Sequence, residues 1–247
     1  MLSKNKIKFI KSLESKKMRS ETGLFLAEGN KLVADLLPCF HCELLLAKSS
    51  WMATQGDLKA NEMLVADEND IEKASLLKNP QDVLAVFVQP TRKFDKSQPA
   101  NELALVLDGI QDPGNLGTII RLADWFGVST VICSPDTADV YNPKTVQATM
   151  GGLARVSVFY EPLQPAISSC QLPIYGTFLE GNNIYEEKLS PTGLIVMGNE
   201  GNGIRPEIEE AVTNRLHIPN FPLGTPTTES LNVATATAIT LSEFRRR

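Results

Sequence analysis

Short apolar runs separated by helical patterns dominate the second part of the chain. Five recur, at Leu103–Leu107, Thr130–Cys133, Val156–Phe159, Ile174–Phe178 and Leu194–Met197. Such nearly continuous apolar runs are typical of strands buried on both faces of a parallel sheet that is covered by helices. They predict an α/β domain, and sheets of this kind bind ligands at the carboxyl ends of their strands.

The loop after the first run carries polar residues ahead of a predicted helix. Pro113-Gly114 predicts a turn, Asn115 is a candidate cap for the helix, and Arg121 lies about two turns further on. Arg121 is a candidate for the site at the strand ends. The alternative is a surface arginine paired with Asp124.

A glycine-rich loop, Gly198-Asn199-Glu200-Gly201-Asn202-Gly203, follows the fifth run. Three glycines in six residues let the backbone approach a ligand closely. Their order differs from the dinucleotide fingerprint, which also belongs after a first strand. Glu200 is therefore the informative residue, able to accept hydrogen bonds from backbone or ribose hydroxyls or to pair with an arginine.

The last helix is preceded by a polar stretch that contains Ser230 and Asn232. Capping is the ordinary explanation for such residues at a helix start. The helix itself is rich in small and β-branched residues. Spacing predicts a narrow ridge on one face of it, made of Leu231, Ala234, Ala238 and Leu241.

Three stretches of the chain resemble, in order, the three motifs of the SpoU (TrmH-like) group of SPOUT-superfamily RNA 2′-O-ribose methyltransferases. They read D-P-x-N-x-G-x-x-x-R, G-N-E-G-x-G and I-P…E-S-L-N-V-A. The resemblance implies a domain at 102–247 with a parallel sheet and a deep trefoil knot, S-adenosylmethionine (AdoMet) as cofactor, and a homodimer. It implies catalytic roles for Arg121, Asn115, Glu200, Ser230 and Asn232. The implied cofactor contacts are Thr177, Leu179, Gly198, Glu200, Gly201, Ile218, Leu231, Asn232 and Ala234.

One stretch departs from this family's pattern. Residues 220–229 form a longer connection than usual, without the methionine that commonly follows the proline at position 219. The cofactor contact implied for Ile218 is the one that this departure affects most.

Residues 1–90 alternate strand and helix patterns, and 91–101 is a charged stretch with the composition of a linker. The first segment, with Gly23-Leu24-Phe25-Leu26-Ala27, resembles the small α/β substrate-binding domain found in part of the family. A basic helix at 4–19 carries seven basic residues and one acid. Its candidate RNA contacts are Lys4, Lys6, Lys8, Lys11, Lys16, Lys17 and Arg19, with Arg245–Arg247 as a further possibility.

Structured RNA is the implied substrate, and the additional N-terminal domain favours ribosomal over transfer RNA. Three alternatives remain: a tRNA methyltransferase, a non-catalytic RNA-binding or ribosome-assembly protein, and an ordinary nucleotide-binding enzyme. The sequence contains no P-loop, which counts against the last of these. Cys39-Phe40-His41-Cys42 lacks a second ligand pair, so no metal is expected. No apolar run approaches the roughly 20 residues that a membrane span needs. The spacing of the four cysteines does not suggest a set of disulfides, so a cytoplasmic protein is expected.

Overall fold

The computed structural model describes residues 2–95, 102–168, 170–222 and 225–246. It divides into two compact units, one of residues 1–91 and 139–154 and the other of residues 92–138 and 155–247. The segment 139–154 thus packs with the N-terminal part of the chain. The predicted bounds 1–90, 91–101 and 102–247 stay a prediction, and positions 96–101 of the linker lie outside the described residues.

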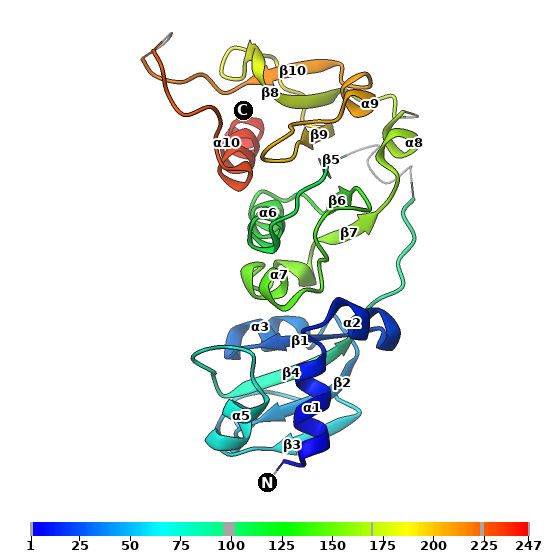
Figure 1. Cartoon of the computed structure of the whole chain (residues 1–247), viewed down its shortest axis with the longest axis vertical. Helices are drawn as coiled ribbons and strands as arrows, with labels where there is room; N and C mark the ends of the chain where they lie inside the picture. The colour runs from blue at the N-terminus through cyan, green and yellow to red at the C-terminus, as the bar shows by residue number, and fades with distance from the viewer. Residues whose placement is uncertain (1, 96–101, 169, 223–224, 247) are drawn as a thin grey trace. The chain divides into compact units, whose positions relative to one another are not determined.

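The first unit is built on a four-stranded sheet of order β1-β4-β2-β3, in which only the β2–β3 pair is parallel (Figure 1). Its strands are β1 (Leu24–Glu28), β2 (Cys42–Ala47), β3 (Glu62–Val65) and β4 (Val83–Val88). Its helices are α1 (Lys4–Ser12), α2 (Lys16–Thr22), α3 (Asn30–Leu36), α4 (Ser49–Met52), α5 (Glu68–Ala74) and α7 (Pro143–Ala148), followed by a 3-10 turn at Gly152–Ala154.

The basic segment predicted as one helix at 4–19 is two helices, α1 and α2. Ser3 caps α1 by accepting a hydrogen bond from the Lys6 N–H at 3.2 Å, and the helix stops before residue 13. Leu13 is fully buried beside Ile10 in the core of the unit. Between the two helices the backbone forms tighter turns, in which Leu13, Glu14 and Ser15 each bond to the carbonyl three residues earlier.

The second unit contains a six-stranded sheet of order β10-β8-β9-β5-β6-β7, with every neighbouring pair parallel. The predicted parallel sheet is confirmed. Its strands are β5 (Leu103–Leu107), β6 (Thr130–Cys133), β7 (Ser157–Tyr160), β8 (Ile174–Asn183), β9 (Gly193–Met197) and β10 (Asn214–His217). Its helices are α6 (Pro113–Trp125), α8 (Leu163–Ile167), α9 (Pro206–Glu209) and α10 (Val233–Arg246). The sequence did not predict β10, because only Leu216 of its four residues is buried.

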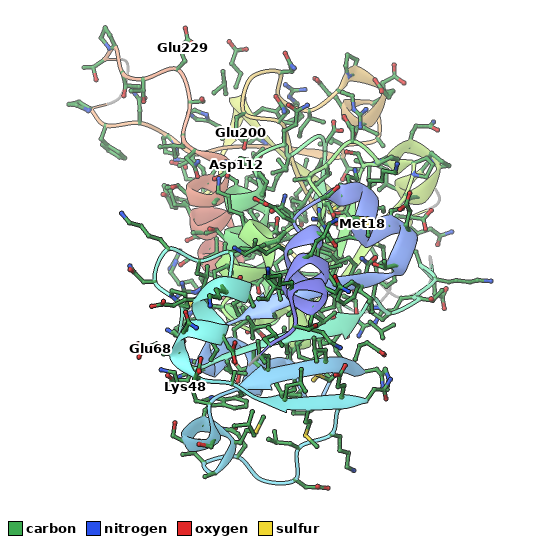
Figure 2. The ribbon with its side chains drawn as sticks, turned by 60° about the horizontal axis from the view of Figure 1, so that its bottom comes forward. Met18, Lys48, Glu68, Asp112, Glu200 and Glu229 are labelled. Atoms are coloured by element: carbon green, nitrogen blue, oxygen red, sulfur yellow. The ribbon has the colours of Figure 1, made fainter. Side chains whose placement is uncertain are left out.

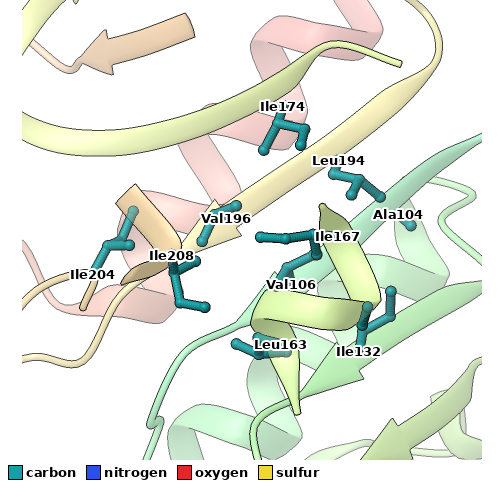
Figure 3. Packing of buried hydrophobic residues seen from close by; sticks show 11 residues of the cluster. Ala104, Val106, Ile132, Leu163, Ile167, Ile174, Leu194, Val196, Ile204 and Ile208 are labelled. Carbon is teal, nitrogen blue, oxygen red and sulfur yellow. The ribbon is translucent and has the colours of Figure 1, made fainter. Parts of the chain in front are cut away.

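Helices cover both faces of this sheet. Figure 3 shows the cluster on one face, where Val106 and Val196 of the central strands meet Leu163 and Ile167 of α8. On β8, Tyr175 alternates with residues of that cluster and therefore points to the opposite face. There its ring lies 4.9 Å from the ring of Phe244 on α10, which in turn packs against α6.

The buried side of α10 differs from the predicted ridge. The helix begins at Val233, so Leu231 precedes it and is 47% exposed, while Ala238 is half-buried. Ala234 and Leu241 are buried as predicted, and the two buried positions between them are Thr237 and Thr240. The buried residues of the helix are Val233, Ala234, Thr237, Thr240, Leu241, Glu243 and Phe244. The Thr237 hydroxyl donates to the carbonyl of Val233 at 2.7 Å, which lets this polar residue face the core.

Candidate active site

The three polar loops meet at one edge of the second unit's sheet. The loops follow β5, β9 and β10; β9 pairs in parallel with β5, and β8 pairs in parallel with both β9 and β10. Because parallel strands end at the same edge, the loops that follow them must come together there. The order of strands, which the sequence does not state, decides this convergence.

Two asparagine side chains join the loops by hydrogen bonds. Asn115 Nδ2 donates to Glu200 Oε1 at 2.6 Å, and Asn232 Nδ2 donates to Asn115 Oδ1 at 3.0 Å. Asn232 Oδ1 in turn accepts from the N–H groups of Ala234 and Thr235 at the start of α10. A continuous chain of hydrogen bonds therefore runs from Glu200 through Asn115 to Asn232, one residue from each loop.

Asn115 is free to make these bonds because it does not cap α6. The cap is Asp112, whose carboxylate accepts the Asn115 N–H at 2.8 Å, with Pro113 as the first residue of the helix. The capping role predicted for Asn115 was wrong, since proline at the first helical position shifts the cap to the residue before it. Asp112 and Glu200, which both bond to Asn115, are labelled in Figure 2.

Asn199 organises the glycine-rich loop, and the sequence analysis missed it. Asn199 and Gly203 exchange two backbone hydrogen bonds of 2.9 Å, which close the turn. The Asn199 side chain accepts from the N–H of Gly201 and donates to the carbonyl of Gly109 at 2.7 Å. A Cβ at Gly198 would lie 2.4 Å from the carbonyl carbon of Gly203, so this position has no room for a side chain. An asparagine among the glycines of a tight turn was the available signal.

The predicted cofactor contacts gather on the β8, β9 and β10 ends and at the start of α10. Thr177 Oγ1 lies 3.4 Å from the carbonyl oxygen of Val196, and Ile218 follows the last residue of β10. Leu179 is 66% exposed and Leu231 is 47% exposed, an unusual state for large apolar side chains. Exposed apolar groups of this kind fit an adenine ring, which takes apolar contacts along with main-chain hydrogen bonds.

Arg121 projects from the exposed side of α6. Asp124, its alternative partner, is held by Arg155 in a two-pronged pair with both N–O distances at 2.7 Å. Among the described residues no hydrogen bond or ion pair reaches the Arg121 guanidinium. The surface pairing with Asp124 is thus not formed, and the guanidinium is available to a ligand.

Ser230 lies on the exposed loop before α10, and no residue that the structure describes forms a hydrogen bond with its side chain. The loop is closed upstream by Asn220, whose amide donates to the carbonyl of Thr225 at 2.9 Å. Positions 223 and 224 lie outside the described residues. Ser230 therefore does not join the chain of bonds made by Asn115 and Asn232.

An ion pair between buried Asp108 and partly exposed Arg205 lies beside the site, and sequence reasoning did not single it out. Asp108 is 1% exposed and accepts from the Arg205 backbone N–H at 2.8 Å and from Arg205 Nε at 2.7 Å. The hydrogen bond from Arg205 to Asp108 is the main cause that raises the pKa of the guanidinium above its ordinary value. An aspartate directly after an apolar strand was the sequence signal, since such positions face the strand-end site.

The basic helices of the first unit expose most of the predicted RNA contacts. Lys4, Lys8, Lys11, Lys16 and Lys17 are exposed. Lys6 is partly covered and forms an ion pair with Glu62. These lysines form a positive surface along α1 and α2.

Arg19 is not part of that surface, because its side chain is only 2% exposed. Its guanidinium donates to the carbonyls of Leu13 and Glu14 at the break between α1 and α2, and to Asp139 at 2.6 and 3.0 Å. All of these contacts lie within the first unit. Its donors satisfy carbonyls left open at a helix end, so we leave Arg19 out of the RNA-contacting set.

The C-terminal arginines are likewise engaged. Arg245 donates to the carbonyls of Phe126 and Gly127 at the end of α6, and Arg246 pairs with Glu243. Arg247 lies outside the described residues.

Comparison with known proteins decides the family. The sequence model of the SpoU rRNA Methylase family matches residues 102–242, and that of an MRM3-like substrate binding domain matches residues 4–85. The chain belongs to the SpoU rRNA methylase family. A relative in Bacillus subtilis, the 23S rRNA (guanosine(2553)-2′-O)-methyltransferase RlmP, is 31% identical, over 97% of this chain and 96% of its own.

Two solved structures extend the comparison to the fold. A putative RNA methyltransferase of the TrmH family from Porphyromonas gingivalis is 41% identical, covers 100% of this chain and 99% of its own, and superimposes with a TM-score of 0.89. An AdoMet-bound rRNA methyltransferase from Sinorhizobium meliloti is 32% identical with a TM-score of 0.83, and the match covers 100% of this chain and 96% of its own.

Neither a metal centre nor a membrane span is evident in the part of the chain that the structure describes. No group of three or more His, Cys, Asp or Glu side chains is placed to hold a metal ion there. Across the same residues, no helix is long and apolar enough to cross a membrane.

Proposed function

We propose that this protein is an AdoMet-dependent RNA 2′-O-ribose methyltransferase that acts on ribosomal RNA. The observation that carries the proposal is the hydrogen-bonded chain Glu200–Asn115–Asn232, which joins one residue from each motif of the family at the strand ends. Two of the relatives named above carry rRNA in their names, the 23S rRNA methyltransferase of Bacillus subtilis and the rRNA methyltransferase of Sinorhizobium meliloti, and both match this chain over nearly its whole length.

AdoMet supplies a methyl group carried on a sulfonium. The residues that would hold it are those at the ends of β8, β9 and β10 and at the start of α10. They are Thr177, Leu179, Gly198, Glu200, Gly201, Ile218, Leu231, Asn232 and Ala234. Ala234 is 6% exposed, so its share of the contact is its backbone, whereas Leu179 and Leu231 offer apolar surface.

A ribose 2′-hydroxyl is a weak nucleophile, so the developing negative charge on its oxygen has to be stabilised. Arg121 is suited to this, because a guanidinium with a pKa above about 12 stays protonated and can bind both a phosphate and an alkoxide. Asn115 and Glu200, fixed against one another, orient the ribose. Asn232 anchors this pair to α10, and Ser230 on the neighbouring loop completes the set.

We further propose that the chain forms a homodimer in the cytoplasm and that its C-terminal segment is threaded into a trefoil knot. The family resemblance supports the knot and the dimer, and Trp125 on α6, which is 82% exposed, supports an interface on that helix. The four cysteines are free thiols, in agreement with a reducing compartment.

The proposed activity is tested with purified protein, tritiated AdoMet and ribosomal RNA from cells that lack the protein. We expect AdoMet binding and transfer of label to a ribose 2′-oxygen, whose position mass spectrometry of RNA from cells with and without the protein would map. Binding of AdoMet without transfer would favour the non-catalytic assembly protein. Tight binding of ATP or NAD without AdoMet binding would favour the nucleotide-binding enzyme.

The dimer is tested by sedimentation equilibrium. We expect twice the chain mass for the wild type and the single-chain mass for Trp125→Glu, because a charge replaces an apolar contact. Met63→Glu, at a half-exposed apolar position in the first unit, is the control and should stay dimeric. A wild type that sediments as one chain at all concentrations would refute the proposed dimer.

A further inference from the structure

A polar pocket opens beside the proposed ribose site, at the ends of β5, β6 and β9. Its polar side chains include those of Asp108, Gln111, Asp136, Asn202 and Arg205. Gly109, with φ +70°, forms part of the wall, and a Cβ there would approach Asp136 to 3.6 Å. The pocket is therefore lined mainly by hydrogen-bonding groups. None of these six residues belongs to the Glu200–Asn115–Asn232 chain.

The two carboxylates of the pocket differ in how closely they are paired with a cation. Asp108 is buried and bound to Arg205 by the contacts described above. Asp136 is 54% exposed, and its nearest cation is Arg205 Nη2 at 3.6 Å from Oδ1. A hydrogen bond from Ser134 is the main cause that lowers the pKa of Asp136, and a backbone hydrogen bond and then the charge of Arg205 lower it further. Asp136 is therefore an ionised carboxylate with room for a ligand.

This arrangement selects the chemistry of the ligand. Two carboxylates and one guanidinium leave a net negative charge, which disfavours a phosphate. A divalent metal is disfavoured too, since no cluster of three acidic, histidine or cysteine ligands occurs among the residues placed by the structure. The pocket suits a neutral group that offers hydrogen-bond donors to Asp136 and an acceptor to Gln111, Asn202 or Arg205.

Among nucleic-acid bases, guanine matches these requirements best. Its Watson–Crick edge carries two adjacent donors, N1–H and N2–H, beside the acceptor O6. Adenine and cytosine each offer one amino donor on that edge, and uracil offers one N–H. Only guanine can place two parallel hydrogen bonds on one carboxylate, and proteins commonly read unpaired RNA bases on this edge.

Resting on the proposed function, we propose that this pocket reads the guanine base of the nucleotide whose ribose is methylated. Asp136 accepts from N1–H and N2–H, and the Gln111 or Asn202 amide donates to O6. The pocket and the proposed ribose site are built from the same two loops, after β5 and after β9, so both lie at the same edge of the sheet. Gln111 precedes Asn115 by four residues, and Asn202 follows Glu200 by two.

The first measurement identifies the labelled nucleoside after reaction of the full-length wild type with tritiated AdoMet and ribosomal RNA from cells that lack the protein. We expect label in 2′-O-methylguanosine alone. Label in 2′-O-methyladenosine, -cytidine or -uridine would overturn the base assignment and leave the proposed function standing. No transfer to any ribose would overturn both.

The second measurement compares Asp136→Asn with Glu210→Gln, a matched loss of one carboxylate at the surface beyond α9. Asp136→Asn should lower kcat/KM for RNA by about 10- to 100-fold, the discrimination typical of one bidentate base contact. Its dissociation constant for AdoMet should equal that of the wild type, which also shows that it is folded. Glu210→Gln should match the wild type both in kcat/KM for RNA and in the dissociation constant for AdoMet. Equal loss of AdoMet affinity and RNA turnover in Asp136→Asn would assign the pocket to the cofactor and overturn the proposal.

The third measurement separates a base contact from a general effect on RNA binding. A short transcript carries the mapped nucleotide as guanosine or as inosine, which lacks the N2 amino group. The wild type should prefer guanosine by about tenfold, and Asp136→Asn should show no preference. A preference of the same size in both proteins would overturn the role of Asp136.

Discussion

Single side chains decide how the candidate site is assembled. Asn115 lies in the first turn of α6, whose cap is Asp112, so its side-chain amide is not needed to cap the helix. With Asp112 as the cap, both ends of the Asn115 amide reach across the sheet edge to Glu200 and Asn232. The Asn115 side chain, three residues after the cap, therefore links two motifs that are distant in the sequence.

Arg121 provides the sharpest test at this scale. We expect Arg121→Ala to lower kcat by about 100-fold, as when one donor to a developing oxyanion is removed, with AdoMet affinity unchanged. Single-turnover methylation and calorimetric AdoMet binding check both parts. Arg92→Ala removes an exposed arginine of the same unit that bonds Ser157, and should retain wild-type turnover. Undiminished methylation by Arg121→Ala would refute the role assigned to it.

At the scale of elements, α10 shows why small residues occupy the last helix. Its buried side carries Ala234, Thr237 and Thr240, which leaves little space between α10 and its neighbours. The five expected strands of the second unit, helix α6 and the location of α10 could be predicted from apolar patterns and turn residues. Strand β10 and the exact buried face of α10 could not, because pairing with β8 and packing against α6 depend on residues far away in sequence.

Replacing alanines by a larger residue should distinguish the buried side of α10 from its half-buried side. Ala234 is 6% exposed, so Ala234→Leu should reduce the free energy of unfolding by about 1–3 kcal/mol through overpacking. Ala238 is only half-buried, and Ala238→Leu should change the free energy of unfolding by less than about 1 kcal/mol. Urea denaturation of the two variants measures the difference. A larger loss of stability at Ala238 would mean that the other side of the helix is the tightly packed one.

Thr240 offers a stabilising change on the same helix. Its hydroxyl is buried and has no hydrogen-bond partner among the residues that the structure places. Thr240→Val removes this group at nearly constant volume and should raise the free energy of unfolding by about 1 kcal/mol. Thr237→Val is the matched control, since the Thr237 hydroxyl is bonded to the Val233 carbonyl and gains nothing by removal. Equal thermal midpoints for the wild type and Thr240→Val would contradict the expected gain.

At the scale of the whole molecule, the two units carry different properties. The second unit contains the candidate site, and the first carries an exposed set of lysines on α1 and α2 in a protein whose net charge is −5. The segment 139–154 belongs to the chain stretch between β6 and β7 yet packs with the first unit, where the Tyr141 ring lies 4.8 Å from that of Phe25. The first unit is therefore completed by residues supplied from the later part of the chain.

The lysines are tested together. Lys4, Lys8 and Lys11 lie on one face of α1, and changing all three to glutamine should weaken RNA binding while AdoMet affinity stays constant. The slope of log affinity against log salt concentration should fall by up to about three, roughly one for each phosphate that the variant no longer neutralises. Filter binding at several salt concentrations measures the slope. Lys31, Lys59 and Lys78, also exposed in the first unit, form a control set with the same charge change. Equal slopes for the two triple variants would contradict a specific role for α1.

Local signals, the apolar runs and turn residues, were enough to predict the parallel sheet, the three motif loops and the family they resemble. They could not show that Asn199 braces the glycine turn, that Asp108 is buried against Arg205, or that Arg19 faces inward. These features depend on strand order and on hydrogen bonds between residues up to 120 positions apart. The tertiary structure decides which polar groups find partners within the protein and which, like Arg121, have none among the described residues. The reason is that those partners come from distant segments.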